Sequence, residues 1–235
     1  MAFSAPPVRA SFRGFLFDMD VSDLRSEIGV APEVILETSH GRRSIDILKI
    51  LAPDKANWEY VKHMEGLLPQ YHGKDAHEIP GARALLKEIG DRNIPWAIVT
   101  SGTVPLVTGW LKMLGLPNPE HLVTAESVQN GKPDPSCYLM GLERVGLAGA
   151  SENENVLVLE DSPAGIKAGK AAGCKVLGLV TSHTPEQVKA AEPDWIVRDL
   201  DSVKIVGFED GLVTLEFSNR LAELSTANGD SAGLQ

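Results

Sequence analysis

Residues 12–20 read FRGFLFDMD, in which the mostly apolar run 12–17 is a candidate strand and is followed by two aspartates. Four further short runs, most of them rich in Val, Ile and Leu, follow at 96–100, 155–160, 175–180 and 195–197. Continuous apolar runs are typical of strands that are buried on both faces of a parallel sheet. Helical patterns lie between the runs, at 81–91, 104–114 and 163–172. This alternation predicts a doubly wound α/β fold.

One stretch departs from the alternation, because no clear strand is found between the first two runs. Instead it contains three patterns typical of helices, at 32–38, 42–51 and 55–69. We therefore predict a small helical insert over residues 21–79, within a core made of residues 1–20 and 80–220. Residues 212–217 are predicted to form a strand of a terminal hairpin. Residues 221–235 are small and polar, and we expect them to fray.

Composition and charge narrow the class of protein. The 235 residues include 22 Lys and Arg against 32 Asp and Glu, a net charge of −10, which disfavours nucleic acids and anionic lipids as partners. No apolar stretch approaches the roughly 18 residues of a membrane span. Two cysteines, Cys137 and Cys174, are too few for a disulfide framework and indicate a reducing compartment. We expect a cytoplasmic protein, as a monomer or weak dimer.

Polar side chains follow the predicted strands where each strand ends. In open α/β sheets, ligands bind at the carboxyl ends of the strands. We expect four carboxylates, one hydroxyl and one ammonium at this edge, from Asp18, Asp20, Glu160, Asp161, Ser101 and Lys132. Four clustered carboxylates need a cation, and hard oxygen ligands together with a substrate phosphate favour Mg²⁺.

The residue types indicate phosphoryl transfer. With Mg²⁺ and Lys132 neutralising charge, Asp18 can act as a nucleophile toward a phosphate ester. Asp20 can protonate the leaving oxygen and then activate water. The Ser101 hydroxyl and nearby backbone N–H groups can hold the phosphoryl oxygens.

Four motifs in this order resemble the haloacid-dehalogenase superfamily of phosphohydrolases over nearly the whole chain: DMD (18–20), VTSGT (99–103), GKPDP (131–135) and LEDSPAGI (159–166). The runs around them are similar to those of fungal glycerol-3-phosphate and 2-deoxyglucose-6-phosphate phosphatases. The resemblance implies a Rossmann-like core, a helical cap inserted after the first strand, Mg²⁺, and a small phosphorylated polyol or sugar as the substrate.

The resemblance also implies roles for individual residues. Asp18 is then the nucleophile and Asp20 the acid/base, and a second Asp at this position argues against the dehalogenase branch. The resemblance implies that phosphate is bound by Ser101, Gly102 and Lys132. It also implies that the metal ion is bound by Asp18, Asp20 and Asp161, with support from Glu160. In the cap, Arg43 is the better match to a substrate-facing arginine, and Arg42 stands beside it.

One departure concerns the segment after Asp20. Val21 stands where the family has Gly, and about 12 residues or more, the length of one helix, are missing before residue 27. The cap is therefore expected to be truncated. Two alternatives to a phosphatase stay open: a phosphomutase on the same core, and a catalytically impaired family member.

Overall fold

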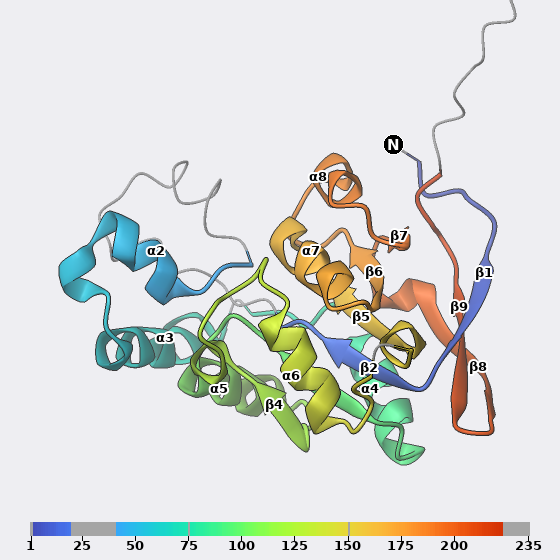
Figure 1. The fold of residues 1–235 in the computed structure, drawn as a ribbon, viewed down its shortest axis with the longest axis horizontal. Helices are drawn as coiled ribbons and strands as arrows, with labels where there is room; N and C mark the ends of the chain where they lie inside the picture. The colour runs from blue at the N-terminus through green and yellow to red at the C-terminus, as the bar shows by residue number, and fades with distance from the viewer. Residues whose placement is uncertain (1, 20–40, 75, 150, 223–235) are drawn as a thin grey trace, which may run out of the picture.

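The computed structural model describes residues 2–19, 41–74, 76–149 and 151–222. A parallel six-stranded sheet, in the order β4-β3-β2-β5-β6-β7, forms its centre (Figure 1). The strands are β2 (Gly14–Phe17), β3 (Trp96–Val99), β4 (His121–Val123), β5 (Val156–Glu160), β6 (Lys175–Leu179) and β7 (Trp195–Val197). The predicted α/β fold with a Rossmann-like parallel sheet is confirmed.

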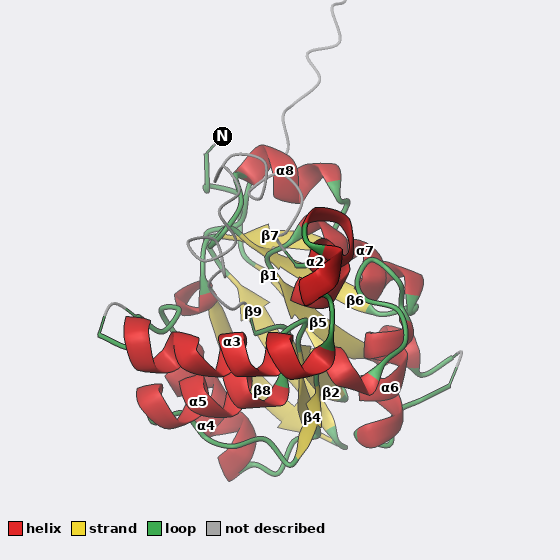
Figure 2. Ribbon diagram, turned by 90° about the vertical axis from the view of Figure 1, so that its left-hand side faces the viewer, coloured by secondary structure: helices red, strands yellow, loops and turns green. Residues whose placement is uncertain are grey.

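Helices cover both faces of this sheet, as Figure 2 shows. They are α4 (Ala82–Asp91), α5 (Val104–Leu114), α6 (Ser136–Arg144), α7 (Pro163–Ala171) and α8 (Pro185–Ala190). Apolar side chains of α6, α7 and α8 pack against one face of the central strands. Those of α4 pack against the other face together with a second, smaller sheet. Because strands β2 and β5 are buried throughout, their sequences are continuous apolar runs.

The second sheet joins the beginning and the end of the described chain. It has three antiparallel strands in the order β1 (Val8–Phe12), β9 (Leu212–Phe217) and β8 (Val203–Glu209). The predicted terminal hairpin is therefore confirmed, and its turn contains Asp210 and Gly211, both with positive φ. The prediction of one strand over residues 12–17 was wrong. The run divides at Arg13, because Phe12 pairs with Val213 whereas Gly14 pairs with Val156.

The insert after β2 contributes α2 (Ser44–Leu51) and α3 (Trp58–His72) to the described structure. The third helix that the sequence predicts, at 32–38, lies outside the described residues. Side chains of α2 and α3 form a small apolar cluster of their own, which includes Ile45, Leu48 and Val61. Helix α3 runs beside α5 (Figure 2). The exact limits of the insert, 21–79, remain a prediction. No described helix is both long and apolar enough to cross a bilayer.

Candidate active site

The carboxyl ends of three neighbouring strands bring the predicted side chains together. Asp18 follows β2 directly, and Glu160 is the last residue of β5. Strand β2 pairs with β5 in parallel register, Phe17 opposite Leu159, so the two ends lie side by side. Asp161 follows Glu160, and oxygen atoms of these three carboxylates lie within 4.8 Å of one another.

Lys132 reaches this cluster from the loop before α6. Its Nζ donates hydrogen bonds to Asp18 Oδ1 at 2.5 Å, to Glu160 Oε1 at 2.7 Å and to the carbonyl oxygen of Val99 at 3.2 Å. An ammonium group has three N–H donors, and these contacts use all of them. The ammonium also lies 5.0 Å from the ring centroid of Tyr138.

The charge of Lys132 is set by its neighbours. Burial by itself lowers the pKa of a lysine, because a low-dielectric environment disfavours the charged form. The carboxylates of Asp18 and Glu160 outweigh burial, so the pKa of Lys132 is raised above its ordinary value. Lys132 therefore stays a cation at any physiological pH.

Both carboxylate oxygens of Glu160 accept hydrogen bonds from the protein. Its Oε1 accepts hydrogen bonds from Lys132 and from the Tyr138 hydroxyl at 2.8 Å. Its Oε2 accepts from the backbone N–H groups of Asp161 and Ser162 and from the Ser162 hydroxyl, at 2.9–3.0 Å. A Cβ atom at Gly165 would lie 1.5 Å from Glu160 Oε1, so only glycine fits there. These contacts hold Glu160 in one position and, through it, Lys132.

The motif after β3 faces both the core and the insert. The Ser101 hydroxyl donates a hydrogen bond to the carbonyl oxygen of Gly41 at 2.9 Å. The N–H of Gly102 donates to Thr100 Oγ1 at 3.0 Å, and that hydroxyl donates to the carbonyl oxygen of Met19 at 2.8 Å. The ends of β2 and β3 are thereby tied together.

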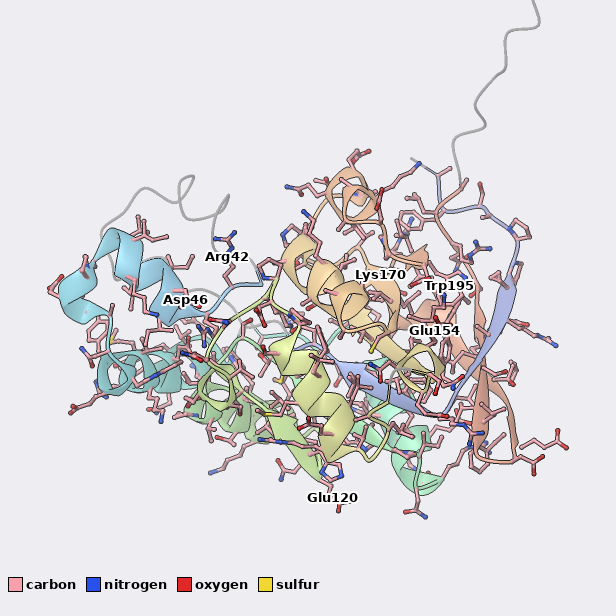
Figure 3. All side chains as sticks on the ribbon, in the orientation of Figure 1. Arg42, Asp46, Glu120, Glu154, Lys170 and Trp195 are labelled. Atoms are coloured by element: carbon pink, nitrogen blue, oxygen red, sulfur yellow. The ribbon has the colours of Figure 1, made fainter. Side chains whose placement is uncertain are left out.

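The two predicted cap arginines lie in different environments. Arg42 is exposed, and Figure 3 shows its side chain near the start of α2, on the side that faces α7. Arg43 is buried, and its guanidinium contacts Asp46 and backbone carbonyls of the loop after β4. Asp20, predicted as acid/base and metal ligand, lies outside the described residues, as does the departure at Val21.

Comparison with known proteins decides the family. Residues 16–179, more than half of the chain, match the family described as haloacid dehalogenase-like hydrolase. This chain belongs to that family.

Relatives and solved structures agree with this assignment. Glycerol-1-phosphate phosphohydrolase 2 of Saccharomyces cerevisiae is 33 % identical over 237 residues, covering 92 % of this hydrolase and 94 % of the yeast protein. Hexitol phosphatase A of Escherichia coli is 35 % identical over 224 residues, covering 87 % and 99 %. A hydrolase from Pseudomonas syringae shares the fold, with a TM-score of 0.63, 23 % identity, and coverage of 80 % and 94 %.

The similarity to named phosphatases supports the expected class, a phosphoric monoester hydrolase. The yeast alignment spans 237 positions yet includes only 92 % of a 235-residue chain. The yeast protein therefore has residues with no counterpart in this hydrolase. The segment that the sequence indicates to be missing after Asp20 stays a prediction.

Two contacts of the site were not predicted from the sequence of this hydrolase. Tyr138, on α6, donates to Glu160, and Thr181 Oγ1 donates to Asp161 Oδ2 at 2.6 Å. Thr181 follows β6, so the rule of reading each strand end would have found it. Tyr138 gives no such signal, because it lies within a helix among apolar residues.

The described residues fit a divalent cation. Three carboxylates and one ammonium converge, which leaves two negative charges in excess. All donor atoms of the carboxylate cluster are oxygens, the ligands that Mg²⁺ prefers. Since protein donors surround both oxygens of Glu160, Asp18 and Asp161 are the better placed ligands of the three.

Proposed function

We propose that this hydrolase is a Mg²⁺-dependent phosphatase of small phosphomonoesters, either a glycerol phosphate or a sugar phosphate, and that it works through an aspartyl-phosphate on Asp18. The observation that carries the proposal is the contact between Lys132 Nζ and Asp18 Oδ1 within the carboxylate cluster. An ammonium fixed beside a carboxylate lowers the repulsion that an approaching phosphate dianion meets. The names of the yeast and bacterial relatives support the choice of substrates.

In the first step, a carboxylate oxygen of Asp18 attacks phosphorus, and the bond from phosphorus to the substrate's alcohol oxygen breaks. Asp20 gives its proton to that oxygen, and the alcohol leaves. Lys132 stabilises the charge that gathers on the phosphoryl oxygens. The N–H groups and hydroxyl at Ser101 and Gly102 bind the same oxygens once the substrate displaces their present partners.

In the second step, water attacks phosphorus and gives a proton to Asp20. The bond to Asp18 breaks, and inorganic phosphate leaves with the carboxylate restored. The net reaction is hydrolysis of one phosphate ester by one water molecule.

Asp18 and Asp161 would hold the metal ion, together with Asp20. When bound, Mg²⁺ supplies positive charge that offsets the phosphate dianion and the two excess negative charges of the site. The role of Glu160 as a ligand stays a prediction. Its five protein contacts favour a role in holding Lys132.

Among the described residues of the insert, Arg42 has an exposed guanidinium, and we assign it to the hydroxyl groups of the substrate, far from the phosphate. Arg43, the stronger match by sequence, is already bonded within the protein.

The test is phosphate release from glycerol, hexitol and hexose phosphates, with Mg²⁺ and with EDTA, by the wild type and by Asp18→Asn. We expect turnover only with Mg²⁺ and a loss of about a thousandfold or more in Asp18→Asn. Asp54→Asn, at an exposed position of the insert, is the control. An isomeric phosphoester in place of free phosphate identifies a phosphomutase. A folded chain that releases no phosphate from any substrate identifies an impaired family member.

A further inference from the structure

Arg43 uses its whole hydrogen-bonding capacity inside the protein. Its Nε and Nη2 donate to the two carboxylate oxygens of Asp46, at 2.6 and 3.0 Å. Its remaining N–H groups donate to the carbonyl oxygens of Ala125, Val128 and Gln129, at 3.3, 2.8 and 3.0 Å. A guanidinium has five N–H donors, and all five are engaged. The side chain of Arg43 is 5 % exposed, so solvent does not compete for these contacts.

These carbonyls belong to the loop that leads to Lys132. Gly131, the residue before Lys132, lies directly against the pair. A Cβ atom there would be 2.7 Å from Arg43 Nε and 3.0 Å from Asp46 Oδ2. Because no side chain occupies that space, Arg43 and Asp46 can approach the backbone of the loop closely. Arg43 therefore contacts the loop at residues 125–129 through hydrogen bonds and again at Gly131 through close packing.

Asp46 holds the guanidinium of Arg43 from the side of the insert, opposite the carbonyls of the core loop. Arg43 immediately precedes α2, and Asp46 lies in the first turn of that helix. Burial opposes the charge of Asp46, but hydrogen bonds from Arg43 and Lys49 lower the pKa of its carboxyl group below the ordinary value. Asp46 therefore stays ionised and keeps its two hydrogen bonds to Arg43. These bonds hold the planar guanidinium of Arg43 at the start of α2.

Neighbouring contacts place the same end of α2 on the core. Ser44 Oγ donates to Glu65 Oε1 at 2.5 Å, and Glu65 Oε2 accepts the N–H of Thr103 at 2.7 Å. Gly41 accepts from Ser101. The start of α2 therefore meets the loop after β3 as well as the loop before Lys132.

We propose that Arg43, oriented by Asp46, is a positioning residue that docks the insert on the core and thereby fixes the loop carrying Lys132. The effect of Arg43 on turnover rests on the proposed function. Its role in docking the insert rests only on the contacts described above. It differs from the substrate contact that the sequence predicts for Arg43. A docking residue affects every phosphoester, whereas a contact to a distant hydroxyl affects only esters that have one.

The experiment compares Arg43→Lys, Asp46→Asn and Gly131→Ala with two matched controls. Arg92→Lys alters an exposed arginine–glutamate pair at the end of α4, and Gly90→Ala adds a methyl group where no atom lies within 4 Å. Hydrogen exchange of the backbone amides at 125–131 is measured without substrate. Values of kcat and KM are measured for methyl phosphate and for a hexitol phosphate, with Mg²⁺.

We expect faster exchange at 125–131 in the three variants and in neither control, because the bonds that order the loop are weakened. We expect kcat to fall by about tenfold, by the same factor for both substrates, because a displaced Lys132 impairs a step common to both. Gly131→Ala leaves every charge in place and keeps the test valid if Asp46→Asn does not fold.

Unchanged exchange in all three variants would overturn the docking role. The other contradicting outcome is a higher KM for the hexitol phosphate alone, in Arg43→Lys but not in Asp46→Asn. It would show that Arg43 contacts the substrate. If the wild type releases no phosphate from any substrate, the proposed function fails, and the exchange measurement still decides whether Arg43 docks the insert.

Discussion

Lys132 and Glu160 form an ion pair of 2.7 Å in which the side chains are 1 % and 0 % exposed. Asp18 adds a second carboxylate, 9 % exposed, on the same ammonium. Removing water from both partners of an ion pair is costly, and the attraction between them offsets that cost only when the geometry is good. The pair therefore makes the site sensitive to any change that removes one partner and leaves the other charged.

Lys132→Met tests this sensitivity. The variant leaves two neighbouring carboxylates without their cation, so we expect a loss of about 3 kcal/mol or more in the free energy of unfolding at pH 7.5. The loss should shrink as the pH falls, because protonation of the carboxylates removes the repulsion between them. Urea unfolding at several pH values measures both effects.

The matched control is Lys170→Met, which breaks a half-exposed ion pair with Asp194. That change should cost about 1 kcal/mol or less. Equal losses in the two variants would contradict the special position of Lys132.

Mg²⁺ should stabilise the folded protein as well as support turnover. A ligand at a hundred times its dissociation constant adds about 2.7 kcal/mol to the stability of the folded state. We therefore expect MgCl₂ to raise the melting temperature by several degrees, and Asp161→Asn to abolish the rise. Calorimetry without substrate checks this. A rise that survives in Asp161→Asn would place the ion elsewhere, and Asp54→Asn should behave as the wild type does.

Glu65 should make stability depend on pH. Burial raises the pKa of this carboxyl group above its ordinary 4.5, more than its hydrogen bonds from Ser44 and Thr103 lower it. The folded state then holds the proton more tightly than the unfolded chain, so the contribution of Glu65 to stability is largest below pH 4.5 and is lost as the pH rises through the folded pKa.

Glu65→Gln keeps the shape and removes the charge. Its free energy of unfolding should match the wild type near pH 4 and exceed it by about 1 kcal/mol or more at pH 8. Urea unfolding across this range measures the difference. Glu59→Gln, at an exposed position of the same helix, should show no such divergence. A constant difference between Glu65→Gln and the wild type would contradict the raised pKa.

The two thiols should be unreactive in the folded protein. Burial raises the pKa of Cys137 to about 11 and that of Cys174 to about 12, so neither is a thiolate at pH 8. With Ellman's reagent we expect no colour from the native protein and two equivalents in urea. A thiol that reacts within minutes in the native protein would show that its part of the core opens.

The sequence predicts the centre of the molecule well and its periphery poorly, for physical reasons. Residues Val156–Glu160 are buried on both faces, so their apolar run alone identifies a strand. Residues Val8–Phe12 alternate between exposed side chains and side chains that are partly or fully buried. Over five residues this alternation is a weak strand signal. The partner strand β9 lies some 200 residues further along, so nothing nearby in the sequence strengthens that signal. Strand β4 has only three residues, two of them partly exposed, and was also missed.

The same contrast holds within the site. Asp18, Glu160 and Asp161 could be predicted because the ends of parallel strands meet at one edge of a sheet. The contacts of Arg43 could not, because the groups that it binds on the core are backbone carbonyls 82 to 86 residues away. Any residue type can supply a carbonyl, so the sequence around 125–129 carries no trace of the contact.

The small sheet of β1, β9 and β8 also has a consequence for synthesis on the ribosome. Strand β1 leaves the exit tunnel long before its partner β9, because β9 ends at Phe217, some 200 residues further along the chain. Until then Phe12 lacks its neighbours in β9, among them Val213, with which it pairs. A message cut short before codon 212 would therefore yield a product whose first strand has no partner, and such exposed edges promote aggregation.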